Sequence, residues 1–202
     1  ARLPRGVPLL HDPIFNKGTA FTEEERERLK LRGLLPPRVL TQDQQVQKVL
    51  ENFHRNTSDI ERHIYLISLQ DRNERLFYRV VIDNLEEMTP IIYTPTVGLA
   101  CQLYGHIWRR ARGLFITARD RGRVSQVMRN WPHGPVRAIV ITDGERVLGL
   151  GDLGADLLDP GADGVVAAQP FHHRRVLLGH DHPSGLAEVG HVAADAAFKA
   201  GA

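Results

Sequence analysis

The chain has 202 residues, which suffices for one well-packed core or for one domain and part of a second. Its hydrophobic content of 42% and charged content of 25% are ordinary for a globular protein, and a net charge of +2 is too balanced to indicate a nucleic-acid or membrane partner. It has no apolar run of transmembrane length and no signal-peptide core at its start, and its one cysteine, Cys101, excludes an internal disulfide and suits a cytoplasmic protein.

The first 110 residues predict an array of helices. Three capping boxes, in which a Ser or Thr hydroxyl accepts from the N3 amide and an N3 Glu or Gln reaches back, start at Thr22, Thr41 and Ser58. Gly33 is typical of the C-terminus of the first of these helices, and Pro90 is expected to end a fourth. The spacing of apolar residues predicts one buried stripe on each of the later three helices. The stripes consist of Val46, Val49, Leu50 and Phe53; of Ile60, Ile64 and Ile67; and of Leu76, Phe77, Val80, Val81 and Leu85.

A further helix is expected to begin at Thr94 and Pro95, because proline is favoured at the first helical position and the threonine before it can cap the helix. Trp108 is expected to close this helix. Beyond it the sequence predicts a short strand at 113–117, a short helix at 124–128 and a buried strand at 136–142.

The composition changes near residue 154. The segment 155–202 carries three Lys or Arg against six Asp or Glu, and it holds five of the ten histidines. Of these, His180 and His182 can ligate zinc if a third ligand is present. The segment predicts two strands and an Ala-rich helix over a thin core, with partial disorder. These three elements are expected at 164–168, 175–178 and 189–198.

These patterns together predict an α/β multidomain fragment. Residues 1–130 are expected to form a mostly helical domain, and residues 131–154 the first strands of an α/β domain. Residues 155–202 are expected to form a divergent tail, rich in Ala, Gly and His and loosely packed.

Two residues suit the chemistry of an active site. Tyr93 stands just before a predicted helix N-terminus, where backbone amides and the helix dipole favour negative charge on its oxygen, so it can act as a general acid. Chemistry alone favours instead a buried aromatic whose hydroxyl donates to a backbone carbonyl. Arg146 follows a turn at the end of a buried strand, where ligands collect in α/β proteins and a guanidinium can hold a carboxylate through two parallel hydrogen bonds. The commoner alternative for Arg146 is a hairpin arginine in solvent.

Two segments of the sequence resemble malic enzymes closely. They are residues 91–101 (IIYTPTVGLAC) and 142–154 (TDGERVLGLGDLG). The resemblance implies oxidative decarboxylation of L-malate to pyruvate and CO₂ with NAD or NADP and with Mg²⁺ or Mn²⁺, on an α/β domain like the N-terminal domain of amino-acid dehydrogenases. It implies further that Tyr93 protonates the enol of pyruvate, and that Arg146 binds a malate carboxylate and lies near the nicotinamide.

Residues 70–79 (QDRNERLFYR) also resemble the family. Some animal members have a fumarate activation site at the dimer interface, and the residues aligned with it here are Gln45, Lys48 and Arg72. Lys48 replaces an arginine of that site. Because lysine cannot form the two parallel hydrogen bonds of an arginine, this change argues against fumarate activation and favours a bacterial-like member.

The resemblance stops near residue 154. In the family, the lysine that acts as base follows Gly-Asp-Leu-Gly within a Gly-Met-Gly-Ile-Pro-x-Gly-Lys-Leu segment, whereas residues 155–159 read ADLLD and the only lysine after Lys48 is Lys199. No residue matches the metal carboxylates of the family either, so no metal ligand is assigned. We therefore expect a malic enzyme that is truncated or divergent after residue 154 and inactive by itself. Two alternatives stay open: a non-catalytic fragment that pairs with itself or with a full-length subunit, and a small protein that binds metal through its tail histidines.

Overall fold

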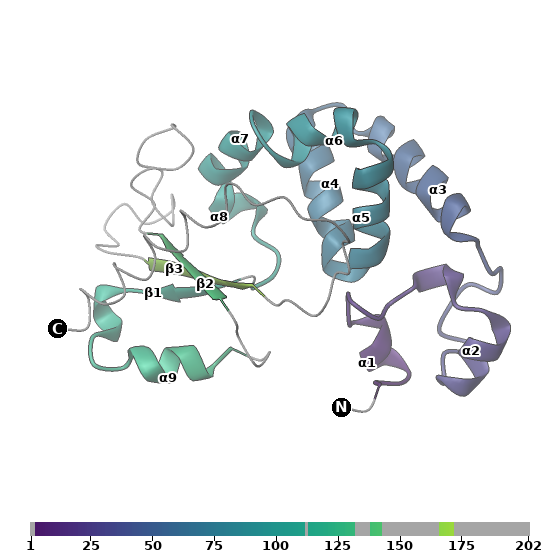
Figure 1. The fold of residues 1–202 in the computed structure, drawn as a ribbon, viewed down its shortest axis with the longest axis horizontal. Coiled ribbons are helices and arrows are strands. Elements are labelled where there is room, and N and C mark those ends of the chain that lie inside the picture. Colours follow the sequence, from purple (N-terminus) through teal and green to yellow (C-terminus); the bar gives the residue numbers. More distant parts are fainter. Residues whose placement is uncertain (1–2, 112, 132–137, 143–165, 172–202) are drawn as a thin grey trace, which may run out of the picture. The chain divides into compact units, whose positions relative to one another are not determined.

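The computed structural model of the chain describes residues 3–111, 113–131, 138–142 and 166–171 (Figure 1). The chain falls into two compact units, Ala1–Leu103 and Tyr104–Ala202. This division does not test the domain bounds predicted from composition, which stay a prediction. The described elements of the first unit are α1 (Val7–Leu10), the 3₁₀ helix η1 (Gly18–Ala20), α2 (Glu23–Arg28), α3 (Gln42–Arg55), α4 (Asp59–Arg72), α5 (Glu74–Asp83), α6 (Leu85–Ile92) and α7 (Thr96–Gln102).

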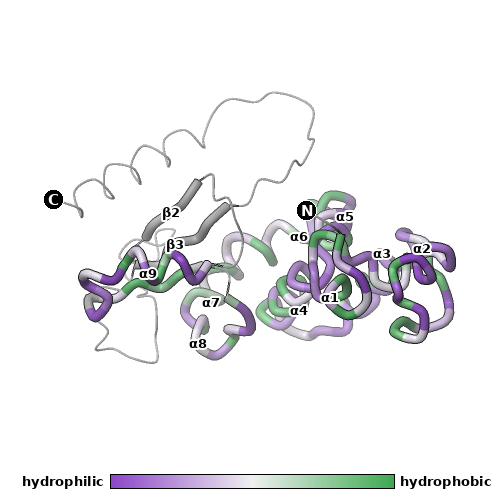
Figure 2. The backbone as a smooth tube through the Cα atoms, turned by 90° about the horizontal axis from the view of Figure 1, so that it is seen from below, coloured by the Kyte–Doolittle hydropathy of each residue, from purple (hydrophilic) through white to green (hydrophobic). Residues whose placement is uncertain are grey.

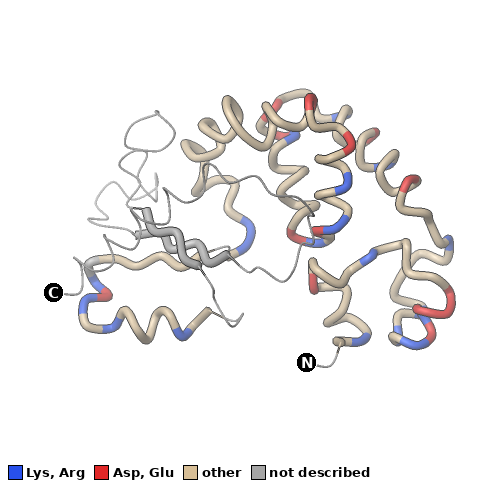
Figure 3. The backbone as a smooth tube through the Cα atoms, viewed as in Figure 1, with Lys and Arg blue, Asp and Glu red and all other residues tan. Residues whose placement is uncertain are grey.

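Three helices of the first unit, α2, α3 and α4, begin with complete capping boxes, as the sequence predicts. Thr22, Thr41 and Ser58 each accept a hydrogen bond from the backbone N–H of the N3 residue, whose side chain accepts one from the N–H of the cap. In α3, Gln44 N lies 3.2 Å from Thr41 Oγ1, and Thr41 N lies 3.1 Å from Gln44 Oε1. Acidic residues in the first turn of each helix are favoured by the positive end of the dipole (Figure 3).

Replacing Thr41 with alanine is expected to lower the free energy of unfolding by about 1 kcal/mol, because the N–H of Gln44 loses its acceptor. Thr41→Ser keeps the hydroxyl and is expected to keep most of the stability. Gln47→Ala, at an exposed position of the same helix, is the control and is expected to change stability by no more than about 0.5 kcal/mol. Urea unfolding followed by far-UV circular dichroism measures all three, and equal stabilities of Thr41→Ala and Gln47→Ala would contradict the assigned cap.

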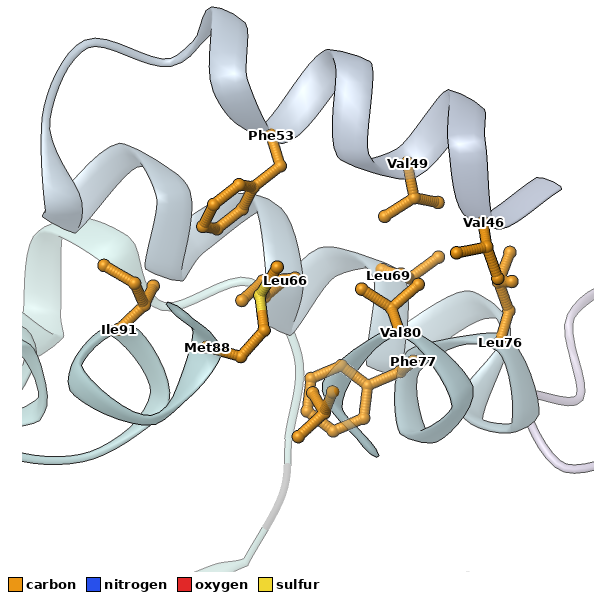
Figure 4. Close-up of a cluster of buried hydrophobic side chains, with 11 residues drawn as sticks. Val46, Val49, Phe53, Leu66, Leu69, Leu76, Phe77, Val80, Met88 and Ile91 are labelled. Atoms are coloured by element: carbon orange, nitrogen blue, oxygen red, sulfur yellow. The ribbon is translucent and has the colours of Figure 1, made fainter. Parts of the chain in front are cut away.

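The core of the first unit is a cluster of apolar side chains from the four helices α3 to α6 (Figure 4). Phe53, Leu66, Val80 and Met88 are completely buried in it. These helices carry both hydrophobic and hydrophilic residues, as burial of one face requires (Figure 2). The stripe predicted on α3 packs in or against this cluster, and so does the part of the third predicted stripe that lies within α5. The cluster consists of Val46, Val49, Phe53, Leu66, Leu69, Leu76, Phe77, Val80, Val81, Met88 and Ile91.

The face of α4 that packs on this core is not the predicted one. The buried residues of α4 are His63, Leu66 and Leu69, whereas the predicted stripe of Ile60, Ile64 and Ile67 is half-buried. Helix α4 packs against α3, α5, α6 and α7, and these neighbours decide which side turns inward. Hydropathy could not show this, because one member of the buried face is a histidine.

The helix predicted to end at Pro90 is in fact two helices. The chain breaks at Asn84, which has φ −132° and ψ 42° and whose Nδ2 donates to the carbonyl of Val80 at 2.9 Å. Leu85, predicted in the buried stripe, is 58% exposed because the break ends the periodicity. Pro90 lies inside α6, near its C-terminal end, where the missing N–H removes a single helical hydrogen bond.

Lys30, and not Gly33, ends the turn that closes α2. The N–H of Leu31 donates to the carbonyl of Arg26 at 2.8 Å and the N–H of Lys30 to that of Glu27 at 3.2 Å, which is a Schellman motif. Lys30 has a φ of 60° and Leu31 is completely buried. The prediction for Gly33 was wrong. Because a lysine rarely adopts positive φ, the sequence gave no sign that the helix is closed at Lys30.

Helix α7 also differs from the prediction. It begins at Thr96 with Pro95 as its N-cap, so the expected cap by Thr94 with Pro95 as first helical residue was wrong. The Thr94–Pro95 peptide bond is cis. The helix ends at Gln102 rather than at Trp108, and a separate short helix follows in the second unit.

The second unit contains a three-stranded antiparallel sheet in the order β1-β3-β2. Ala168 of the central strand pairs with Leu114 of β1 and with Ile141 of β2. The strands predicted at 113–117, 136–142 and 164–168 are confirmed, with bounds that differ by a few residues. The short helix predicted at 124–128 is also confirmed. The predicted elements at 175–178 and 189–198 lie outside the described residues. The described elements are α8 (Tyr104–Ile107), β1 (Leu114–Ile116), the 3₁₀ helix η2 (Ala118–Asp120), α9 (Val124–Arg129), β2 (Ala138–Thr142) and β3 (Val166–Phe171).

The described part of the chain is mostly helical, as predicted. The start of a dehydrogenase-like α/β domain stays a prediction, since the described strands pair antiparallel. The central strand, β3, comes from the segment predicted as a loosely packed tail, so the change in composition near residue 154 does not end the sheet. None of the helices in the described ranges combines the length and apolarity needed to span a membrane.

Candidate functional site

Tyr93 lies in the short connection between α6 and α7. Its backbone N–H donates to the carbonyl of Thr89 at 2.9 Å, and its carbonyl accepts from the N–H of Val97 at 2.9 Å. The side chain is 55% exposed, so the interpretation of Tyr93 as a buried aromatic is wrong. The fold thus presents a phenol at the surface of the unit on a backbone that is held from both sides, which suits a group that transfers a proton to a substrate.

The electrostatic argument for Tyr93 needs a correction. Helix α7 begins three residues after Tyr93, its N-cap Pro95 has no N–H, and the first amides of Val97 and Gly98 already donate to backbone carbonyls. Tyr93 is also the C-cap of α6, where the helix dipole disfavours negative charge. Because the two helix ends offset each other, exposure and a fixed backbone are what favour this residue as an acid.

Arg146 lies outside the described residues, so its distance from Tyr93 is not defined. Strand β2 ends at Thr142, four residues before Arg146 in the sequence. Cys101, in α7, is a free and half-buried thiol, and burial raises its pKa. A thiol with a raised pKa stays protonated, so Cys101 is no candidate nucleophile.

The three residues aligned with the effector site are only partly brought together. Gln45 is buried, and its Nε2 donates to the carbonyl of Lys17 at 3.0 Å and to Thr19 Oγ1 at 3.1 Å. Lys48 is exposed one turn further along α3, and Arg72 is exposed at the end of α4. The effector site stays a prediction.

A cavity of about 440 Å³ opens at the N-terminal ends of α2, α3 and α5. Gln45 lines it together with Lys17 and Arg75, and neither of the other two predicted effector residues does. Lys17 Nζ lies 2.5 Å from the carboxylate of Glu25. Burial acts to raise the pKa of Glu25, but the hydrogen bonds that this carboxylate accepts, first that from Lys17, outweigh burial and hold the pKa below its ordinary value.

No three His, Cys, Asp or Glu side chains within the described ranges are placed to hold a metal ion. The antiparallel sheet is likewise not the parallel arrangement that binds dinucleotides. The described residues therefore do not fit the cation or the nucleotide that the resemblance implies. His180 and His182 lie outside the described residues, so the metal-binding alternative stays a prediction.

Comparison with known proteins agrees with the motifs. A model of the malic enzyme N-terminal domain matches residues 70–159, which include Tyr93 and Arg146. The NADP-dependent malic enzyme of Anas platyrhynchos is 59% identical over 152 residues, which are 75% of this chain and 27% of that protein. The enzyme of the same name from Rattus norvegicus is 55% identical with the same coverage. The chloroplastic NADP-dependent malic enzyme of Oryza sativa subsp. japonica is 54% identical over 149 residues, 74% of this chain and 23% of that protein.

Residues 70–159 of the chain are a malic enzyme N-terminal domain, as its motifs predicted. The relatives carry the name of NADP-dependent malic enzymes, and the chain spans about a quarter of their length. They come from two animals and a plant and do not test the expectation of a bacterial-like member.

Proposed function

We propose that this chain is part of an NADP-dependent malic enzyme, which converts L-malate to pyruvate and CO₂ with Mg²⁺ or Mn²⁺. The observation that carries the proposal is Tyr93, a surface phenol on a fixed backbone inside the part that matches the family domain. NADP is proposed over NAD because the named relatives are NADP-dependent. A cytoplasmic location is proposed because a lone cysteine suits a reducing compartment.

In this reaction the segment around Tyr93 is assigned the last step. Loss of hydride from C2 of malate and of the proton from its C2 hydroxyl gives oxaloacetate; the family's lysine base, which this chain lacks, would take that proton. Cleavage of the C3–C4 bond of oxaloacetate then releases CO₂ and leaves the electron pair on C3. Tyr93 then gives its Oη proton to C3, which forms the methyl group of pyruvate. Arg146 is proposed to hold a malate carboxylate through two parallel hydrogen bonds. When bound, NADP would accept the hydride and the cation would stabilise the enolate.

We further propose that the chain by itself does not turn over malate. The lysine base of the family is missing from the place that the motif gives it, and the sequence has no lysine between Lys48 and Lys199. The test compares the purified chain with a chimera in which its 152 matched residues replace the corresponding part of the Anas platyrhynchos enzyme. With malate, NADP and Mn²⁺, we expect the chimera to form NADPH and the chain alone to form none. A folded but inactive chimera would overturn the proposed function, and turnover by the chain alone would overturn the need for further residues.

A second proposal concerns assembly. Tyr78 and Ile82 lie one turn apart on α5 and Leu85 begins α6, and these three apolar residues are 44%, 62% and 58% exposed. Exposed apolar residues that gather on consecutive helices favour a protein interface. We propose that the helical unit pairs through this surface with a second copy or with a full-length subunit.

Ile82→Glu is expected to dissociate that dimer, because a carboxylate cannot be buried there without a partner. Light scattering coupled to size exclusion should show twice the chain mass of 22.7 kDa for the parent and the single mass for the variant. Gln47→Glu adds the same charge at an exposed position of α3 and is expected to stay dimeric. A parent that is monomeric at every concentration would exclude the proposal.

A further inference from the structure

His63 is a buried polar side chain that the proposed chemistry does not use. It lies on α4 and is 7% exposed. Its Nδ1 lies 2.8 Å from the backbone oxygen of Ile91, near the end of α6. Because a carbonyl oxygen can only accept, Nδ1 must carry the proton, and the contact fixes the tautomer of the ring.

The carbonyl of Ile91 needs this donor. In a continuing helix it would accept from the N–H four residues on, but that residue is Pro95, which has no N–H. Ile91 is 4% exposed, so water has little access to it. An unpaired buried carbonyl is unfavourable, and His63 supplies the hydrogen bond that the local sequence cannot.

The contact acts on the backbone two residues before Tyr93. The N–H and the carbonyl of Tyr93 are themselves bonded to Thr89 and Val97, so three hydrogen bonds hold this short connection. Helix α4 packs against both α6 and α7, and through His63 it makes a polar contact with the end of α6. The helix that carries His63 is therefore the support for both sides of the connection.

We propose that His63 is a positioning residue for Tyr93. By donating a hydrogen bond to the carbonyl of Ile91, His63 fixes the position of the Tyr93 phenol. The expected effect on catalysis rests on the proposed function of Tyr93 as the acid. The expected effect on the position of the phenol does not. It predicts that loss of the Nδ1 donor lets the phenol occupy more than one position. In the chimera, such a misplacement is expected to lower kcat by about 10- to 100-fold with little change in KM for malate.

The test uses the full chain with 3-fluorotyrosine in place of Tyr93 and records its ¹⁹F resonance. His63→Leu has a similar size and no donor, and His63→Asn carries an amide N–H near the place of Nδ1. Leu69→Ala on the same helix removes a core side chain that is 2% exposed and keeps the hydrogen bond, so it is the control for lost stability. In the parent, ¹⁵N spectra of the histidine rings report directly whether Nδ1 of His63 is protonated.

We expect one narrow ¹⁹F line for the parent, for His63→Asn and for Leu69→Ala, and a line that is split or about twofold broader for His63→Leu. An unprotonated Nδ1 in the parent, or an unchanged line in His63→Leu, would overturn the proposal. If the ¹⁹F results hold while Tyr93→Phe leaves kcat of the chimera unchanged, the proposed acid role fails and the positioning of Tyr93 by His63 stands.

Discussion

Phenylalanine in place of Tyr93 is expected to lower kcat for pyruvate formation by about 10²- to 10⁴-fold, the range that one general acid contributes. The change keeps the ring and removes the hydroxyl whose proton is proposed to reach C3 of the enol. Since the side chain is 55% exposed, the free energy of unfolding is expected to change by no more than about 0.5 kcal/mol. NADPH formation and pyruvate release by the chimera measure the first effect, and urea unfolding of the chain measures the second.

The control for Tyr93→Phe is Tyr78→Phe. Tyr78 is 44% exposed on a different helix, so this variant removes a surface hydroxyl of the same kind and is expected to keep the parent kcat. Reduction of oxaloacetate by NADPH places no proton on C3 and is expected to persist in Tyr93→Phe. Pyruvate formation at the parent rate in Tyr93→Phe would exclude this tyrosine as the acid.

Methionine in place of Arg26 is expected to lower the free energy of unfolding by about 3–4 kcal/mol. Arg26 is 3% exposed, and the nearest carboxylate, of Glu23, is 4.0 Å away and 56% exposed, so backbone oxygens are its main partners. These oxygens would lose their donor with no water to replace it. They belong to Phe21 at 2.8 Å, Pro36 at 2.7 Å, Pro37 at 3.2 Å, Thr19 at 3.1 Å and Arg38 at 3.4 Å.

Arg28→Met is the matched control for this effect. It makes the same change two residues away on α2 at an exposed position, where a substitution is expected to alter stability by no more than about 0.5 kcal/mol. The free energy of unfolding of Arg26→Lys should fall between those of Arg26→Met and Arg28→Met. Lysine keeps the charge, but its ammonium lacks the planar guanidinium fork that reaches several oxygens at once. Urea unfolding measures the stability of all three variants. Equal stabilities of Arg26→Met and Arg28→Met would contradict the stabilising role of the hydrogen bonds that Arg26 donates to backbone oxygens.

Local signals in the sequence predicted local structure well. The capping boxes at Thr22, Thr41 and Ser58 form as expected, because the groups that bond are three residues apart and need no tertiary context. The buried stripe of α3 also follows from its spacing, since the helix is long and strongly amphipathic.

What the sequence could not predict depends on contacts between distant segments. In the sequence, Arg26 is one of several charged residues of an acidic helix, and nothing marks it as buried. It is buried because the loop that contains Pro36 and Arg38 folds back onto it. The inward face of α4 is chosen by its neighbours, and Asn84 breaks a helix that its apolar spacing would continue. Neither charge nor hydropathy of a single segment carries this information.

The candidate site was predicted from motifs more than from physics. Tyr93 was chosen because its segment resembles the family, while the helix-dipole argument for it failed because Tyr93 is also the C-cap of α6. His63 was missed because a single histidine in a helix gives no signal. Its role follows only from the missing N–H of Pro95, which becomes significant when α4 and α6 are seen to pack together.

Deuterium exchange into the methyl group of pyruvate tests the central claim most directly. In D₂O with pyruvate, NADP and Mn²⁺, the chimera is expected to replace methyl protons with deuterium, as followed by the loss of the methyl ¹H NMR signal. The same chimera carrying Tyr93→Phe should exchange at least about 10²-fold more slowly, because the group that moves the proton to and from C3 is gone. Equal exchange rates for the two proteins would contradict the account and would require another acid.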